Sequence, residues 1–306
     1  MIGRDDGFGP ERVHQNVLEL ELEKVPFAQG RQFALVGFCC DEGVKRNKGR
    51  VGAAHGPEHL RKSLANLALP GDPKNQIIDV GDIFCTDSDL EKAQTDLGAV
   101  VGTLLAKRYI PIVLGGGHET AWGHFQGIAP HSKNTLIVNF DAHYDLRPLI
   151  DDRWGSSGSP FYQIAEFCKT EKRPFHYLCI GVQGSSNTDS LLKRAAELHV
   201  HSVMADTLHT EGLASTQTLL SKLLDQHDSV YLSICLDVFA HAYAPGVSAP
   251  QALGLTPWQV LPLLRKIVSS GKLRSADVVE LCPALDQDSQ TAKLGASLIW
   301  EILTGS

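Results

Sequence analysis

Residues 139–145 read Asn139-Phe140-Asp141-Ala142-His143-Tyr144-Asp145. This stretch directly follows an apolar run over residues 135–138, which is typical of a buried parallel strand. A second polar stretch, Gly115-Gly116-Gly117-His118-Glu119, follows the apolar run 109–114 in the same way. The sequence therefore places carboxylates and imidazoles at the carboxyl ends of two strands, where open α/β sheets hold their ligands.

These polar side chains suit a divalent metal ion. Two carboxylates (Asp141 and Asp145) and two imidazoles (His118 and His143) favour an ion of borderline hardness, such as manganese, over calcium or a structural zinc. For a single residue we would prefer a plainer explanation, in which an Asp caps a helix or a His fills a gap in the core. The pattern Asp-x-His-x-Asp, together with a glycine-flanked His after another strand, favours the metal site.

The bulk composition narrows the class of protein. With 306 residues, 43% of them hydrophobic, the chain can bury a large core in one large domain or two modest ones. The formal charge of -7 is spread along the chain, and the basic residues are scattered apart from a cluster at 45–50, which disfavours nucleic acid as a partner. No apolar run approaches the ~20 residues that span a bilayer, and the charged start is not typical of a secretory signal.

The cysteines bear on the compartment. Their number, seven, is odd, and no CxxC pair occurs. Reduced thiols in a cytosolic compartment explain this usage most simply, so we expect a cytoplasmic protein.

Strand-like and helix-like segments alternate from beginning to end. The predicted strands cover residues 33–38, 76–80, 110–114, 136–140, 175–180, 230–235 and 275–281, with a weaker one near 200–204. The predicted helices cover residues 57–67, 89–107, 120–128, 161–167, 189–199, 215–226, 257–269 and 291–303. This alternation predicts an α/β fold with a mostly parallel central sheet covered by helices on both faces.

Domain organisation follows from the same pattern. No linker rich in Pro, Ser or Gly divides residues 31–306, so we expect a single domain there. Residues 1–30 differ and are predicted to form a polar N-terminal arm with one amphipathic stretch near Val13 to Val25. Packing across the domain and contact with a neighbouring subunit both remain open for this arm.

Two further strand ends carry acids. Residues 232–237 end in Asp237 and lead into a loop through Pro245 and Pro250, and residues 278–283 contain Glu280 before a proline. Taken separately, each acid could equally be a helix cap, because acids at strand ends often cap the next helix.

With these residues in place, the chain resembles the arginase/agmatinase/formiminoglutamase family of ureohydrolases over nearly its full length. The three family signatures correspond to residues 115–119, 139–145 and 233–250. The resemblance implies a three-layer α/β/α arginase-like fold with a binuclear manganese cluster. By the family pattern, one ion takes His118, Asp141, Asp145 and the position of Cys235, and the other takes Asp141, His143, Asp237 and again the position of Cys235.

Several stretches look like the formiminoglutamase branch: residues 3–7, 50–53, 145–148, 156–161, 181–183 and 186–188. Arginases carry a proton-shuttling His in the loop where this chain has Ser157-Gly158. The resemblance therefore implies a hydrolase that cleaves N-formimino-L-glutamate to L-glutamate and formamide in histidine breakdown. A guanidino or ureido hydrolase of the same family, agmatinase-like or guanidinobutyrase-like, is the alternative.

The substrate's chemistry fits one basic residue in particular. Formiminoglutamate carries two carboxylates, and Arg147 lies two residues beyond Asp145, where it could form a bidentate pair with one of them. A surface ion pair with Asp151 or Asp152 is the alternative for Arg147. Asn187 and Arg153 are weaker candidates for the remaining carboxylate oxygens.

The implied mechanism uses the metal pair to make a nucleophile. Two divalent ions about 3.5–4 Å apart would lower the pKa of a shared water, and the resulting hydroxide would attack the formimino carbon. We expect Asp145 to hydrogen-bond the nucleophile and pass its proton to the departing nitrogen. Glu280 would accept hydrogen bonds from the formimino N–H groups and orient the carbon.

Cys235 departs from the family pattern, which has an Asp bridging both ions at this position. A thiolate is softer than a carboxylate and prefers zinc or copper(I) to manganese. Four outcomes remain open: two weakly held ions, one ion, a different metal bound through sulfur, or a catalytically impaired homologue that serves as a scaffold or regulatory subunit.

The family often forms trimers or hexamers, so a homo-oligomer is a further possibility. His124, six residues beyond His118, is poorly spaced for one helix face and is left out of the metal set.

Overall fold

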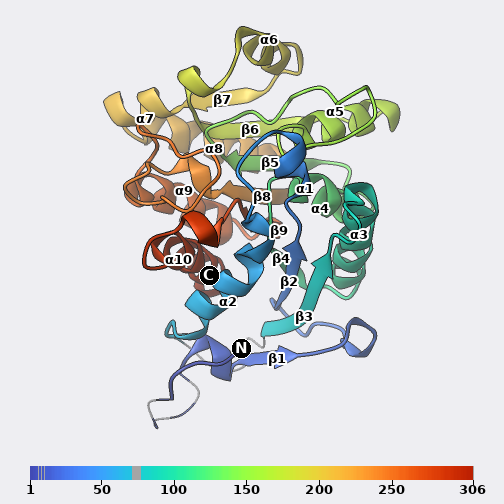
Figure 1. Ribbon diagram of the computed structural model, residues 1–306, viewed down its shortest axis with the longest axis vertical. Helices are drawn as coiled ribbons and strands as arrows, with labels where there is room; N and C mark the ends of the chain where they lie inside the picture. Colours follow the sequence, from blue (N-terminus) through green and yellow to red (C-terminus); the bar gives the residue numbers. More distant parts are fainter. Residues whose placement is uncertain (6, 8, 10, 71–76, 306) are drawn as a thin grey trace.

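The computed structural model describes residues 1–305 apart from 6, 8, 10 and 71–76. Within these residues the strands are β1 Val17–Glu19, β2 Phe33–Cys39, β3 Ile77–Phe84, β4 Ile110–Leu114, β5 Thr135–Phe140, β6 His176–Val182, β7 His201–Met204, β8 Ser229–Cys235 and β9 Leu273–Val279. They form one nine-stranded sheet in the order β1-β3-β2-β4-β9-β8-β5-β6-β7. Figure 1 shows this order from β1 at the bottom to β7 at the top.

Every pair of neighbouring strands in the described sheet is parallel. Each predicted strand is present, although several ends differ: β3 runs on to Phe84, and β9 stops at Val279, so that Glu280 and Leu281 follow the strand instead of closing it. Residue 76, the predicted start of β3, lies outside the described residues.

Helices cover both faces of the sheet. They are α1 Glu42–Arg46, α2 Gly56–Ala65, α3 Leu90–Ala106, α4 Thr120–Ile128, α5 Pro160–Thr170, α6 Asp189–Glu197, α7 Ala205–Thr210, α8 Ala214–Gln226, α9 Pro257–Ser269 and α10 Gln290–Thr304. Buried side chains of α2 and α7 to α10 share one core cluster, and those of α3 to α6 share another. In Figure 1, α9 and α10 lie to the left of the sheet and α3 and α4 to its right.

Alternation along the strands accounts for the two cores. On β4, Ile112 and Leu114 belong to the first core and Val113 to the second. On β5, Leu136 and Val138 belong to the first core. Successive side chains of a strand point to opposite faces, and a strand buried on both faces needs apolar residues at nearly every position. The predicted three-layer α/β/α fold with a mostly parallel sheet is confirmed.

Helix α3 illustrates how local sequence shapes one outer layer. The side chain of Asp89 accepts a hydrogen bond from the Lys92 N–H at 3.0 Å and so caps the start of the helix. Its buried residues include Leu90, Leu97 and Val101, which recur at helical spacing and face the second core.

The N-terminal arm adds a strand to the edge of the same sheet. β1 pairs with β3 as an edge strand, with Val17 opposite Ile77. The Met1 amino group forms an ion pair with Glu19 at 2.5 Å. The amphipathic stretch noted in the sequence is therefore a short strand between two 3₁₀ turns, Val13–Gln15 and Leu22–Lys24.

The seven cysteines form no disulfide with one another in the described part of the chain. None of the helices in that part combines the length and the apolar character needed to cross a membrane.

Candidate metal centre

Four adjacent strands bring the predicted ligands together. β4, β9, β8 and β5 are consecutive in the sheet, so their carboxyl ends lie side by side. His118 follows β4, Asp141 follows β5, Cys235 ends β8, and Glu280 follows β9. The residues come from four separate segments of the chain, and the strand order gathers them.

The glycines after β4 let the chain turn tightly beside neighbouring backbone. A Cβ at Gly116 would overlap the carbonyl oxygen of Cys40. Two hydrogen bonds hold the turn against the end of β9: Gly115 N–H donates to Val278 O at 2.8 Å, and Glu280 N–H donates to Gly116 O at 2.8 Å. Only glycine permits such a close approach, and this places His118 beside the end of β9.

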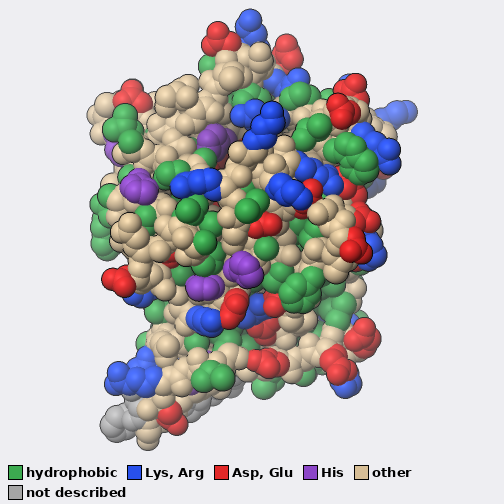
Figure 2. Space-filling view, viewed as in Figure 1, with side chains coloured by type: hydrophobic (Ala, Val, Ile, Leu, Met, Phe, Trp, Pro, Cys, Tyr) green, Lys and Arg blue, Asp and Glu red, His purple; other side chains and the backbone are tan. Residues whose placement is uncertain are grey.

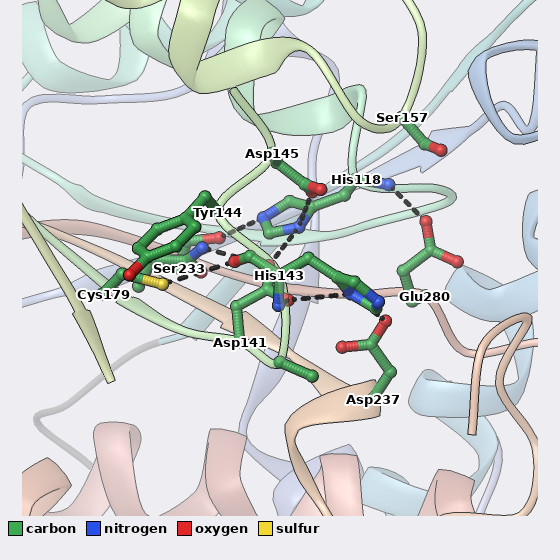
Figure 3. Close-up of polar contacts among 12 residues, drawn as sticks. His118, Asp141, His143, Tyr144, Asp145, Ser157, Cys179, Ser233, Asp237 and Glu280 are labelled. Carbon is green, nitrogen blue, oxygen red and sulfur yellow. Dashed lines mark hydrogen bonds and ion pairs between the residues drawn. The ribbon is translucent and has the colours of Figure 1, made fainter. Parts of the chain in front are cut away.

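Two overlapping groups of donor atoms lie here: His118, Asp141 and Cys235 form the first, and Asp141, His143 and Asp237 the second. Figure 3 shows their acids and imidazoles, with Asp145 beside the first group. In the first group, Nδ1 of His118 lies 2.9 Å from a carboxylate oxygen of Asp141 and 2.9 Å from one of Asp145. In the second, Nδ1 of His143 lies 3.4 Å from Asp141 Oδ1 and 3.3 Å from Asp237 Oδ2. Asp141 is fully buried and belongs to both groups.

Neighbouring hydrogen bonds fix the tautomer of His118. Ser233 donates its hydroxyl hydrogen to Asp277 Oδ1 at 2.6 Å, because a carboxylate only accepts. Ser233 Oγ must then accept from Nε2–H of His118, at 2.9 Å. In the neutral ring, the form that binds a metal ion, the lone pair of His118 consequently sits on Nδ1, the atom that faces the two carboxylates.

A buried network extends behind Ser233. Asp277 also accepts from the Tyr231 hydroxyl at 2.5 Å and contacts Nδ1 of His124 at 2.7 Å. Nε2 of His124 lies 2.5 Å from Ser275 Oγ, which itself donates to a backbone carbonyl. His124 is therefore a supporting residue behind the site, consistent with its exclusion from the metal set.

Asp141 is also held from several sides. It accepts the backbone N–H of His143 at 2.7 Å and the side-chain N–H of Asn139 at 3.0 Å. The Asn139 amide also donates to the hydroxyl of Tyr177 at 3.0 Å. These contacts orient one carboxylate toward both imidazoles.

The electrostatics of the protein groups alone point to a missing positive charge. Burial would lower the pKa of His118, but Asp141 and Asp145 outweigh it and raise that pKa well above its ordinary value. Burial, and then the charge of Asp141, raises the pKa of Asp145. Burial, followed by Glu119 and Asp237, raises the pKa of Glu280. Several carboxylates so close together repel one another, and a cation among them relieves that repulsion.

Two buried atoms show where such a cation fits. Nδ1 of His118 and Oδ1 of Asp237 have no hydrogen-bond partner in the described structure. For His118 this describes the neutral ring, because the carboxylate oxygens 2.9 Å away could accept a hydrogen bond only from a protonated Nδ1. Buried polar atoms rarely stay unsatisfied, so the donor set fits a divalent metal ion.

A cleft of about 280 Å³ opens over these residues. His118, His143, Asp145, Asp237 and Glu280 line its floor, and the basic residues Lys48, Arg50 and Arg147 also line it. In the space-filling view, basic side chains gather near the middle of the visible face beside a small acidic group (Figure 2). The cleft thus combines an acidic floor with a basic rim.

The three predicted substrate-binding residues lie in different settings. Arg147 lines the cleft, and no hydrogen bond or ion pair of its side chain is present among the described residues. Asn187 also lines the cleft, but its amide donates to Ala142 O and Gln183 O and accepts from Tyr144 N–H. Arg153 is not among the described residues that line the cleft, and its guanidinium lies over the Trp154 ring at 4.2 Å.

The surroundings of Asn187 and Arg153 bear on their predicted contact with substrate. Asn187 has its amide hydrogens and its oxygen occupied by backbone, so its contacts favour a role in shaping the cleft wall. The stacking of Arg153 on Trp154 does not favour contact with substrate.

Several functional neighbours escaped sequence reasoning. Ser233 has the same strand parity as Cys235, and Asp277 is a charged residue directly before the apolar end of a strand, so both carried a signal. For Lys48 the sequence showed only that it belongs to a basic cluster, which does not indicate a place at the cleft. Its exposed side chain lies at the cleft because the turn after α1 reaches over the strand ends.

Comparison with known proteins gives independent evidence of the family to which the chain is related. The sequence profile of the arginase family matches residues 31–305. The chain is 42% identical over 301 residues to the formimidoylglutamase of Legionella pneumophila (strain Paris), covering 98% of this chain and 94% of that protein. It is 45% identical over 282 residues to the formimidoylglutamase of Paraburkholderia xenovorans (strain LB400), covering 88% and 86%.

Solved structures share the architecture. The crystal structure of Bacillus subtilis formimidoylglutamase superposes with a TM-score of 0.85 at 21% identity, covering 99% of this chain and 95% of that one. Trypanosoma cruzi formiminoglutamase, solved with Mn²⁺, gives a TM-score of 0.80 at 24% identity, covering 94% of this chain and 98% of that one. At these identities the likeness establishes the fold.

Proposed function

The chain belongs to the arginase family, and we propose that it hydrolyses N-formimino-L-glutamate to L-glutamate and formamide. The observation that carries the proposal is the pair of donor groups sharing Asp141, placed beneath a cleft with a basic rim. Relatives named formimidoylglutamase, 42% and 45% identical over most of the chain, support the same substrate.

We propose manganese as the metal, in two positions. One position would use His118, Asp141, Asp145 and Cys235, and the other Asp141, His143 and Asp237. The Mn²⁺ in the Trypanosoma cruzi formiminoglutamase structure supports this choice of ion. When bound, the ions would lower the pKa of a water molecule enough to supply a nucleophile near neutral pH.

The rim of the cleft accounts for a substrate with two carboxylates. The guanidinium of Arg147 can pair with one carboxylate through two parallel N–H···O bonds. Lys48 lines the same cleft and also lacks an ion-pair partner among the described residues, so its ammonium can hold the other carboxylate. Agmatine, which has no carboxylate, would leave both charges without a partner.

Nearby side chains position this cationic rim. The Asn47 amide donates to the Ser157 hydroxyl at 3.1 Å. A Cβ at Gly158 would stand 2.7 Å from Cδ of Arg147 and 3.1 Å from the amide nitrogen of Asn47, so Gly158 leaves room for both. Asn47 precedes Lys48 directly, and the contact therefore links the turn after α1 to the loop that holds Arg147.

Glu280 and Asp145 take the polar roles in the reaction. One oxygen of Glu280 accepts the His118 backbone N–H at 2.7 Å, which fixes the carboxylate at the cleft floor. Its second oxygen can accept a formimino N–H and hold the carbon in place. Asp145, 2.9 Å from Nδ1 of His118, is placed to move a proton from the attacking water to the departing nitrogen.

The overall reaction balances simply. Water adds to the formimino carbon, the bond from that carbon to the glutamate nitrogen breaks, and the nitrogen leaves as the amine of L-glutamate. The carbon and the other nitrogen leave together as formamide.

The test is a side-by-side assay of the manganese-loaded protein with formiminoglutamate, arginine, agmatine and guanidinobutyrate. We expect formamide release from the first substrate and no measurable urea from the others. Turnover of a guanidino substrate instead would assign the chain to another branch of the family. No turnover with any substrate or divalent metal would indicate a catalytically impaired homologue.

A further inference from the structure

Cys235 has surroundings unlike those of three other buried cysteines in the described chain. Cys40, Cys168 and Cys179 belong to the apolar core behind α3 to α6, as expected for a thiol that packs as a small hydrophobic group. Cys235 is only 1% exposed but belongs to neither large core cluster. It lines the metal cleft at the end of β8.

The sulfur atom stands among metal-binding donors. Sγ of Cys235, a ring nitrogen of His118 and a carboxylate oxygen of Asp141 all lie within 4.8 Å of one another. The second group of donors, from Asp141, His143 and Asp237, contains no sulfur. Asp141 is thus the one residue common to both groups in the described chain.

A second observation marks the first group as a cation site. Nδ1 of His118 is buried, lacks a hydrogen-bond partner and, in the neutral ring, carries the lone pair. A thiol placed next to such an atom and to a carboxylate has the composition of a mixed nitrogen, oxygen and sulfur ligand set.

We propose that Sγ of Cys235 binds one metal ion, so that the centre has two chemically unequal halves. The half with His118, Asp141 and Cys235 would favour softer divalent ions such as Zn²⁺ or Co²⁺, while the half with His143 and Asp237 keeps ligands suited to Mn²⁺. This inference rests on the metal centre of the proposed function. It adds that the sulfur makes this half prefer a softer ion to the manganese proposed for it above.

The geometry also places the sulfur on one side of the centre. A carboxylate can bridge two ions through its two oxygens, whereas Cys235 contributes a single donor atom that groups with His118 and not with His143. Asp141 alone then connects the two halves. We therefore infer that the half containing His143 loses a ligand relative to a centre with two bridging carboxylates, and that its ion is held less tightly.

Cobalt provides a direct test, because a thiolate bound to Co²⁺ gives an intense sulfur-to-metal absorption band in the near ultraviolet. We would titrate the purified full chain with Co²⁺ and follow this band. It should rise with one equivalent per chain in the wild type and be lost in Cys235→Ser, while the weaker visible cobalt bands persist. Cys168→Ser is the matched control, since Cys168 is buried in the apolar core, and it should retain the band.

Metal preference gives the second measurement. From equal concentrations of Mn²⁺ and Zn²⁺, the wild type should take up zinc at one position, and Cys235→Asp should shift the bound ratio toward manganese. We expect a change of about tenfold or more, since losing even an outer-shell partner changes metal affinity 10- to 100-fold. An unchanged ratio, or a cobalt band that survives in Cys235→Ser, would overturn the inference.

The two proposals can fail separately. If the cobalt band behaves as expected while formiminoglutamate is not cleaved, the sulfur ligand stands and the proposed substrate falls. If formamide is released but cobalt bound to the wild type shows no sulfur band, the reverse holds.

Discussion

Asp145 and Glu280 share a left-handed backbone conformation, with φ of 49° at Asp145 and 69° at Glu280. Residues other than glycine seldom adopt it, and it costs on the order of 1–3 kcal/mol at each position. Both residues line the cleft, and both are proposed to take part in the proton and substrate chemistry. Two of the described residues with this backbone conformation therefore lie at the cleft.

Replacing Glu280 by glutamine tests its proposed role. The amide nearly preserves shape but removes the negative charge that would hold the formimino group. We expect kcat/KM for formiminoglutamate to fall about 100-fold, the usual loss when a positioned polar group is removed from a reaction centre. Steady-state kinetics measures this, with the exposed Glu171→Gln as a control that keeps full activity. An unchanged kcat/KM in Glu280→Gln would remove the residue from the mechanism.

The basic rim should govern substrate affinity. Arg147→Met and Lys48→Met each remove one proposed partner of a substrate carboxylate, so we expect KM for formiminoglutamate to rise about ten- to a hundredfold in each. Arg153→Met is the matched control, because that guanidinium stacks on Trp154 away from the cleft. Equal effects of all three substitutions would show a general charge effect instead of specific pairing.

The hydroxyl of Ser233 should matter for metal affinity. In Ser233→Ala, Nε2–H of His118 loses its acceptor and Asp277 loses a donor, so the imidazole is less firmly oriented. We expect metal affinity to drop about 10- to 100-fold, measured by competition with a chelator. Ser229→Ala, at the other end of β8, should leave affinity as in the wild type. A similar drop in both variants would point to a general effect on the strand.

Much of this arrangement could be predicted from the sequence, because parallel strands have strong local signals. The bounds predicted for β4 and α4 match the structure. The glycine turn between them separates the apolar run of the strand from the helix, so the end of one and the start of the other are easy to place. β1 was not predicted, because it has only three residues, all partly or fully exposed, and so shows almost no hydrophobic periodicity. Its strand conformation depends on pairing with β3, which is a tertiary effect.

The residues of the site also differ in how far the sequence could predict their positions. His118, Asp141 and His143 could be placed because each follows a recognisable strand. Lys48 could not, because its position depends on how the turn after α1 folds over other strands. Likewise, stacking on an adjacent ring explains why Arg153, close in sequence to Arg147, lies elsewhere.

Two glycines should respond oppositely to alanine. At Gly116 a methyl group would overlap the backbone carbonyl of Cys40, which cannot move aside easily, so we expect destabilisation of about 3 kcal/mol. At Gly102 in α3 the nearest atom to the new methyl lies 3.7 Å away, and a helix gains about 0.5–1 kcal/mol from this change. Unfolding in denaturant measures both. Equal stability of the two variants would contradict the close approach at Gly116.

A cluster of histidines should make stability depend on pH. Burial, followed by His227 and His201, lowers the pKa of His176, and the rings of His176 and His227 lie 4.4 Å apart. Burial, followed by Lys222 and His227, lowers the pKa of His201. The folded state therefore resists protonation, and this stability is present above about pH 6.5 and lost as pH falls through that value.

Between about pH 7.5 and 5.5, we expect the melting temperature of His201→Gln to fall less than that of the wild type, because one of the repelling groups is gone. Thermal unfolding at several pH values measures this slope. The exposed His131→Gln is the control and should follow the wild type. A steeper slope in His201→Gln would reverse the assigned sign.

The insertion of β9 between β4 and β8 has a consequence for biogenesis. The strands that carry His118 and Cys235 become next-but-one neighbours only after residues 273–279 have entered the sheet between them. On the ribosome, a nascent chain cannot complete this edge until translation has passed Glu280. Such late, long-range pairing is slow, so we expect metal loading to follow synthesis of the last strand.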